Sequence, residues 1–118
     1  MLISSLRKRK RYILFKVFSE ESINYTSFKE LLNSTFLKFY GELEFSKFDF
    51  KLLDERWDDK EHIGIAKCNH KFTPNVIVIF GLLQRIGEYR INVKILKVSG
   101  TIKSLLKNLR MKFKVNNR

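Results

Sequence analysis

Three side chains that could bind a metal ion lie within nine residues of one another: His62, Cys68 and His70. Zinc sites use four such ligands, or three and a water molecule, at paired spacings. Cys68 and His70 lie two residues apart on a predicted strand and so point the same way, but no second pair accompanies them. We interpret these residues as structural and expect no metal or cofactor to be bound by the protein.

A second group of candidates is acidic: Asp54, Glu55, Asp58, Asp59 and Glu61. Paired carboxylates can hold magnesium for phosphoester hydrolysis. Acidic residues are also common in hairpin turns, and this stretch has that composition. No phosphate-binding glycine loop, dinucleotide fingerprint or nucleophile elbow accompanies it. A stand-alone metal-dependent nuclease is therefore an alternative function, and we expect no catalytic residues in the chain itself.

Positive charge is the strongest chemical signal. The chain of 118 residues has 24 Lys and Arg against 12 Asp and Glu, a net charge of +12. Residues 1–19 carry six basic and no acidic side chains, residues 20–61 are net acidic, and residues 62–118 carry twelve basic side chains and one acidic one. So unbalanced a domain repels itself, and a polyanion such as nucleic acid would neutralise it.

Two segments are the candidates for contacting phosphate. One is a block of five consecutive basic residues near the N-terminus, and the other is a predicted helix start, Ser99-Gly100-Thr101, where hydroxyls and free N–H groups suit a phosphate. An ordinary helix cap is the competing interpretation of the second segment. The predicted RNA-binding residues are Arg7, Lys8, Arg9, Lys10, Arg11, Ser99, Thr101, Lys103, Lys107, Arg110 and Lys112.

Base stacking is not the expected mode of binding. RNA-recognition motifs place aromatic side chains on their central strands, and residues 62–69 have none. Contacts with the phosphates and 2′-hydroxyl groups of structured RNA fit the composition better.

The elements that must position these residues alternate between strand and helix patterns. Strands are expected over residues 12–18, 45–57, 62–69 and 89–98, helices from Thr26 or Ser27 to Gly41 and from Thr73 to about residue 86, and a last helix from Ser99. Residues 76–83 could also form a strand, but the Thr-Pro start favours a helix. Both alternating sets of residues 12–18 are mainly apolar, which indicates a sheet covered on both faces.

The resulting order, β-α-β-β-α-β-α, defines the fold class. We expect an α+β protein with the ferredoxin-like split βαβ sandwich (βαββαβ) and an extra C-terminal helix. Residues 1–11 would be a basic N-terminal segment, residues 12–110 the RNA-binding domain and residues 111–118 a basic tail.

The longest apolar run, residues 76–83, is far shorter than the roughly twenty residues of a membrane span. No signal-peptide pattern follows Met1, and the lone Cys68 favours a reducing compartment. We therefore expect a cytoplasmic protein that does not contact membranes.

Several segments together resemble a known family. They are Arg11-Tyr12-Ile13-Leu14-Phe15, Phe39-Tyr40-Gly41-Glu42, His62-Ile63-Gly64-Ile65-Ala66-Lys67-Cys68 and Val93-Lys94-Ile95-Leu96-Lys97-Val98-Ser99-Gly100-Thr101-Ile102-Lys103. In order and spacing they are similar to protein component 2 of archaeal ribonuclease P, a small subunit family shared with ribonuclease MRP, from about residue 9 to residue 107. The short length suits an archaeal member.

The resemblance implies a noncatalytic subunit beside a catalytic RNA. That RNA, with magnesium, removes the 5′ leader from precursor tRNA. It also implies pairing with a TIM-barrel subunit, protein component 3, and self-association within a heterotetramer. A ferredoxin-like ligand-sensing regulatory domain is a further alternative function, although its weakness is the charge of +12.

Overall fold

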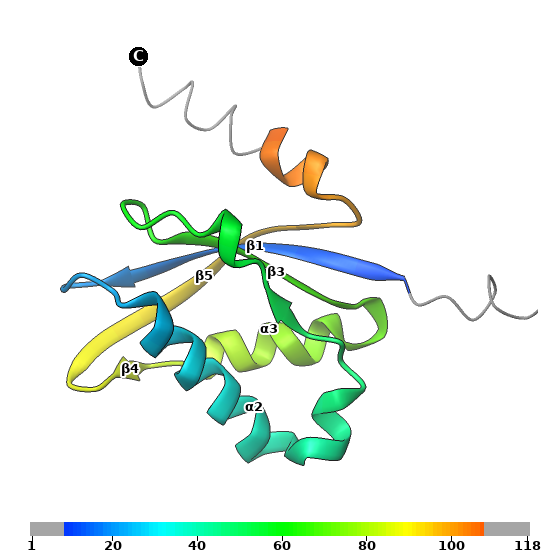
Figure 1. Ribbon diagram of the computed structural model, residues 1–118, viewed down its shortest axis with the longest axis horizontal. Coiled ribbons are helices and arrows are strands. Elements are labelled where there is room, and N and C mark those ends of the chain that lie inside the picture. Colours follow the sequence, from blue (N-terminus) through cyan, green and yellow to red (C-terminus); the bar gives the residue numbers. More distant parts are fainter. Residues whose placement is uncertain (1–8, 108–118) are drawn as a thin grey trace, which may run out of the picture.

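The computed structural model describes residues 9–107 of the chain. A five-stranded antiparallel sheet has the strand order β2-β3-β1-β5-β4. Two helices, α2 and α3, cover one face, and a short helix over residues 102–107 lies on the other (Figure 1). The predicted α+β class and element order are confirmed, and β4 is an additional strand. The elements are β1 (Lys10–Ser19), α2 (Tyr25–Ser46), β2 (Lys51–Leu52), β3 (Ile63–Asn69), α3 (Thr73–Leu82), β4 (Arg85–Ile86) and β5 (Tyr89–Ser99).

Strand β1 lies at the centre of the sheet and contributes side chains to both faces. Ile13, Phe15 and Val17 belong to the large core beneath α2 and α3. Leu14 belongs to a second, smaller cluster on the opposite face, with Tyr12 packed against it. The prediction of a sheet covered on both faces is therefore confirmed.

The N-cap of helix α2 lies earlier in the chain than predicted. Asn24, not Thr26 or Ser27, is the N-cap, and its side chain accepts a hydrogen bond from the backbone N–H of Ser27 at 3.1 Å. Gly41 has φ 76° and kinks the helix, as its predicted stop position suggested, but helical structure resumes up to Ser46. The left-handed φ favours glycine at this position.

The predicted strand over residues 45–57 is wrong for most of its length. Only Lys51–Leu52 is strand, and Phe45 lies in the last turn of α2, with its ring 4.6 Å from that of Phe36. Phe48 is fully buried, and the chain turns at Asp49, which has φ 49°. Packing of these aromatic rings beneath the sheet overrides the imperfect alternation that indicated a strand.

Helix α3 confirms the choice of helix over strand for residues 76–82, with Pro74 in its first turn. It ends at Leu82, earlier than predicted. The expected helix tail instead forms β4, which pairs with β5 through Arg85–Arg90 and Ile86–Tyr89. Gly87 in this tight hairpin has φ 59°, a conformation that glycine adopts without strain.

Candidate nucleic-acid interface

The predicted basic block continues directly into β1. Lys10 and Arg11 are its first residues, so the strand begins two residues earlier than expected. The Arg11 guanidinium donates to the Lys10 carbonyl oxygen at 3.1 Å. Its Nη1 also lies 3.7 Å from the position that a Cβ would occupy at Gly100. The fold thus brings together the two segments predicted to contact phosphate, which are about ninety residues apart in the chain.

The two hydroxyl groups of the second segment have local partners. The Ser99 hydroxyl accepts from the Thr101 backbone N–H at 3.3 Å, and the Thr101 hydroxyl accepts from the Ser104 backbone N–H at 3.2 Å. These are the contacts of an ordinary helix cap. Lys103 and Lys107 are exposed on the helix that follows, as predicted. Four further predicted site residues lie outside the described residues: Arg7, Lys8, Arg110 and Lys112.

Strand register gathers a larger group of lysines, of which the sequence prediction had named only Lys10. Directly opposed residues of antiparallel strands point to the same face of the sheet. One such row runs across four strands, from Lys51 through Lys67 and Tyr12 to Ser99. We call the sheet surface opposite α2 and α3 the lysine face; its lysines are Lys10, Lys16, Lys51, Lys67, Lys94 and Lys97.

The centre of the lysine face is apolar. Leu14, Ile63 and Ile65 are buried there beneath Leu105, with Ile102 and Leu106 packed against them. The helix over residues 102–107 therefore covers the apolar part of this face (Figure 1). Its exposed lysines add to the positive charge of the face that it covers.

Lysines are crowded at the β2 side of this face. Burial lowers the pKa of Lys67, and the charge of Lys10, a side-chain contact with Lys10 and the charge of Lys51 lower the pKa further, whereas Asp49 raises it. Charged lysines are therefore close enough there to disfavour one another. The alternation of Ile91, Val93 and Ile95 with polar residues was a sequence signal for the position of Lys94, whereas Lys97 joins this face through the register shift between Leu14 and Phe15.

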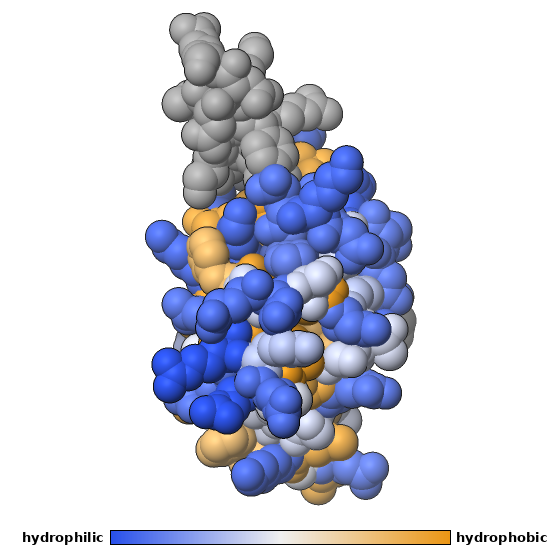
Figure 2. All heavy atoms as spheres, turned by 90° about the vertical axis from the view of Figure 1, so that its left-hand side faces the viewer, coloured by the Kyte–Doolittle hydropathy of each residue, from blue (hydrophilic) through white to orange (hydrophobic). Residues whose placement is uncertain are grey.

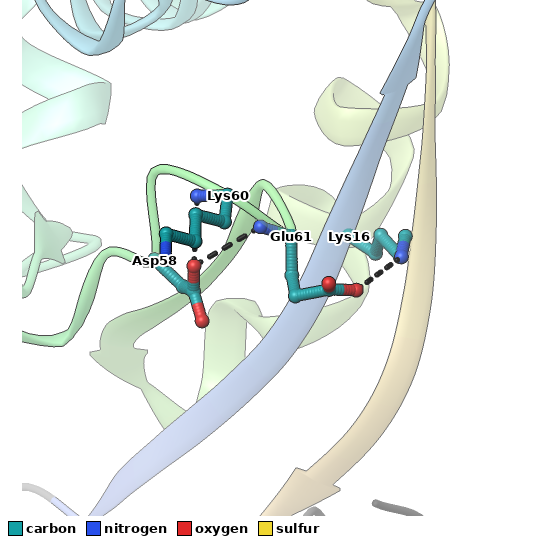
Figure 3. Close-up of polar contacts among 4 residues, drawn as sticks. All are labelled: Lys16, Asp58, Lys60 and Glu61. Carbon is teal, nitrogen blue, oxygen red and sulfur yellow. Dashed lines mark hydrogen bonds and ion pairs between the residues drawn. The ribbon is translucent and has the colours of Figure 1, made fainter. Parts of the chain in front are cut away.

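The acidic stretch does not gather its carboxylates around one point. Figure 3 shows Asp58 accepting from the backbone N–H groups of Lys60 and Glu61 at 2.8 and 3.0 Å, while Glu61 approaches Lys16 at 3.4 Å. These backbone hydrogen bonds lower the pKa of Asp58. The acidic residues thus form a turn, as the competing interpretation held.

Two other carboxylates of the stretch have partners elsewhere. Asp54 accepts from the Tyr25 hydroxyl at 2.7 Å and binds Lys29 at 3.0 Å, which holds its pKa below the usual value. Asp59 accepts from the indole N–H of Trp57 at 2.8 Å. Tyr25 stacks on Trp57, with ring centroids 4.9 Å apart, so these contacts fasten the turn to α2.

The possible metal ligands are separated by the fold. Cys68 is fully buried in the main core, and burial raises the pKa of its thiol. His70 was predicted to lie on the strand with Cys68, but the strand ends at Asn69 and His70 begins a short 3₁₀ helix. His62 precedes β3 with φ 57° and stacks on Trp57. Among residues 9–107, no three His, Cys, Asp or Glu side chains are placed to hold a metal ion together.

An apolar groove of about 560 Å³ lies away from the lysine face, between the start of α2 and the β4–β5 hairpin. Hydrophilic side chains cover much of this end of the molecule, with apolar ones between them (Figure 2). Ile23, Leu31, Ile86 and Tyr89 line the groove with several serines. Large apolar side chains are also exposed on α2, including Phe39 and Leu43.

No helix within residues 9–107 is long and apolar enough to cross a membrane. The fold and its charge distribution define a small, basic α+β protein with one cationic sheet face, a distribution that suits a polyanionic partner. The chain belongs to the Rpp14/Pop5 family, whose pattern matches residues 11–110. The resemblance found in the sequence is thereby confirmed.

Relatives with high coverage are named ribonuclease P protein component 2. The chain is 35% identical to ribonuclease P protein component 2 of Pyrococcus furiosus over 109 residues, which cover 92% of this chain and 89% of the relative. It is 35% identical to ribonuclease P protein component 2 of Archaeoglobus fulgidus, covering 84% and 86%. A chain in the cryo-EM structure of yeast ribonuclease MRP has the same fold, with a TM-score of 0.62, 14% identity and coverage of 92% and 97%.

Proposed function

We propose that this chain is a noncatalytic protein subunit of ribonuclease P that binds the catalytic RNA and supports removal of the 5′ leader from precursor tRNA. Family membership over residues 11–110 is the observation that carries the proposal. Relatives named ribonuclease P protein component 2, which match about nine tenths of the chain, support it. The positive charge of the lysine face agrees with an RNA partner.

In this function the protein would neutralise charge on the RNA and fix the position of the RNA. The lysines of the sheet face, together with Arg9 and Arg11 at the N-terminal end of β1 and Lys103 and Lys107 on the last helix, would neutralise RNA phosphates that otherwise repel one another. Phosphate contacts of this kind fix position without reading sequence. Magnesium would be held by the RNA, and cleavage would be carried out by the RNA.

A protein partner would occupy a different surface. We infer that a TIM-barrel subunit, ribonuclease P protein component 3, docks on apolar side chains away from the lysine face, and that two such pairs join through this chain in a heterotetramer. The apolar groove and the exposed Phe39 and Leu43 are the surfaces available for these contacts. An archaeal, cytoplasmic assembly fits this proposal.

The sheet order also supports the finer fold assignment. Strands β2, β3, β1 and β5 are neighbours in that order, and β3 lies antiparallel between β2 and β1. We infer a ferredoxin-like split βαβ sandwich in which β4 extends one edge and the helix over residues 102–107 is added to the open face.

Salt dependence tests the RNA-binding part of the proposal. If about eight phosphates are contacted, the logarithm of the binding constant should fall with the logarithm of salt concentration with a slope of roughly −6 to −7. The measurement is a filter-binding or anisotropy titration of the full chain against the catalytic RNA. A slope near zero would contradict the proposal.

Reconstitution tests the role in catalysis. The RNA and the TIM-barrel partner are assayed for precursor tRNA cleavage with and without this chain, and the chain should increase cleavage. The control is purified protein with magnesium but no RNA subunit. Leader removal by that control would instead favour a metal-dependent nuclease, and a thermal shift with small molecules but no RNA affinity would favour a regulatory domain.

A further inference from the structure

Three lysines from three different strands converge at one side of the lysine face. Lys51 of β2 is the direct cross-strand partner of Lys67 of β3, and Lys67 is in turn opposite Tyr12 of β1. Lys10, two residues before Tyr12, shares its face and lies close enough to Lys67 for its charge to lower the pKa of Lys67. We call Lys10, Lys51 and Lys67 the three-lysine cluster.

This arrangement brings like charges together in the folded state. Like charges directly opposite each other in a sheet are destabilising, and the charges of Lys10 and Lys51 add to the burial that lowers the pKa of Lys67. The other cross-strand lysine pair of this face, Lys16 with Lys94, has a carboxylate close by, because Glu61 lies 3.4 Å from Lys16. At the three-lysine cluster, the effects of burial and of neighbouring lysines outweigh that of Asp49.

A bound anion would attract all three lysines and so offset the repulsion between them. A phosphate group has several oxygens that accept hydrogen bonds, and three ammonium groups arranged around it satisfy them with charge-assisted bonds. Lys67 is partly buried between the other two, whose side chains are exposed, so the cluster is open to a ligand from solvent. We propose that the three-lysine cluster is a single phosphate-binding site, occupied by one backbone phosphate of the RNA.

This inference rests on the proposed function, because RNA is the source of the phosphate, but it makes a narrower claim. Many independent lysines would each contribute a little and would be interchangeable. One shared site requires that Lys67 matter more than an exposed lysine elsewhere, and that Lys51 and Lys67 act together.

The test compares Lys67→Gln with Lys38→Gln in the full chain. Lys38 is exposed on α2, on the opposite side of the sheet, so its replacement removes the same charge at a matched control position. We expect Lys67→Gln to weaken binding of the catalytic RNA about tenfold and to reduce the salt slope by about one. Lys38→Gln should leave both nearly unchanged. Equal losses in the two variants would overturn the shared site while leaving RNA binding itself intact, whereas a flat salt slope in the unmodified chain would overturn the proposed function.

Two further measurements test the alternatives that the cluster has only a structural role and that its lysines act independently. The melting temperature of Lys67→Gln should equal or exceed that of the unmodified chain, because a crowded charge has been removed; a clear fall would assign the cluster to folding and overturn the proposal. The losses of Lys51→Gln and Lys67→Gln should be less than additive in the double variant, and strict additivity would contradict a common phosphate.

Inorganic phosphate provides a probe that does not depend on RNA. At constant ionic strength, replacing chloride by phosphate should raise the melting temperature of the unmodified chain more than that of Lys67→Gln. An identical rise in both proteins would show that phosphate acts elsewhere and would count against the site.

Discussion

The two faces of the sheet are built from alternate residues of the same central strand, β1, yet one face is packed and the other is charged. Phe15 of β1 packs against Phe28 and Phe80 beneath the helices, with ring centroids 5.7 and 4.8 Å away. Lys16, the next residue, points to the lysine face. One face is closed by aromatic packing, while the other leaves cations exposed around a small apolar centre. The contrast teaches that the packing that stabilises the fold and the charges that we propose bind RNA are separated by the two-residue period of a strand.

The largest expected effect breaks the closed face. Phe15→Ala should lower the free energy of unfolding by about 3–5 kcal/mol, because it removes a fully buried ring and leaves a cavity. Phe18→Ala is the control on the same strand: its side chain is 45% exposed, and its loss should be within about 0.5 kcal/mol. Urea denaturation measures both values. Similar losses in the two variants would show that the faces do not differ as described.

A smaller effect is expected from the apolar centre of the lysine face. Leu105 is fully buried, but its cluster is much smaller than the core beneath α2 and α3. Leu105→Ala should therefore cost about 2–3 kcal/mol in thermal denaturation, near the lower end for a buried leucine. Lys103→Ala, an exposed position on the same helix, should be close to neutral. A cost for Leu105→Ala matching that of Phe15→Ala would mean that the two clusters form a single cooperative core.

The smallest effect concerns acid. The pKa of Asp54 is lowered in the folded state by its bonds with Tyr25 and Lys29, so its stabilising contribution is present above the ordinary aspartate pKa of about 4 and is lost as pH falls through the lowered value. In melting curves from pH 7 to pH 2, Asp54→Asn should flatten the acid slope slightly. An unchanged slope would show that Asp54 does not contribute to the pH dependence of stability.

Much of the candidate interface was predictable because charge is a property of composition. Lys10, Arg11, Lys103 and Lys107 were expected to contact RNA, and the described structure brings Arg11 beside Gly100. Binding by any of these residues stays a prediction, as do the domain boundaries at residues 11 and 110. Lys51 and Lys67 were missed because they are sixteen residues apart and meet only through strand register.

The segment around Phe48 shows why part of the fold was not predictable. Its alternation suggested a strand, but Phe48 lies beside Phe72, with ring centroids 4.7 Å apart, and contacts Tyr40 from α2. These partners come from elements on either side of it in the chain. The alternation of residues along the chain cannot predict such contacts, because they exist only once the helices pack on the sheet.

The sequence by itself determined the charge, the order of strands and helices, the two-sided character of β1 and, through its motifs, the family, because composition, periodicity and motif spacing are properties of the linear chain. Only the tertiary structure decided which lysines share a face, where the acidic turn is fastened and how the last helix divides the open surface. Those outcomes depend on register between strands distant in sequence, and register is set by packing across the whole sheet.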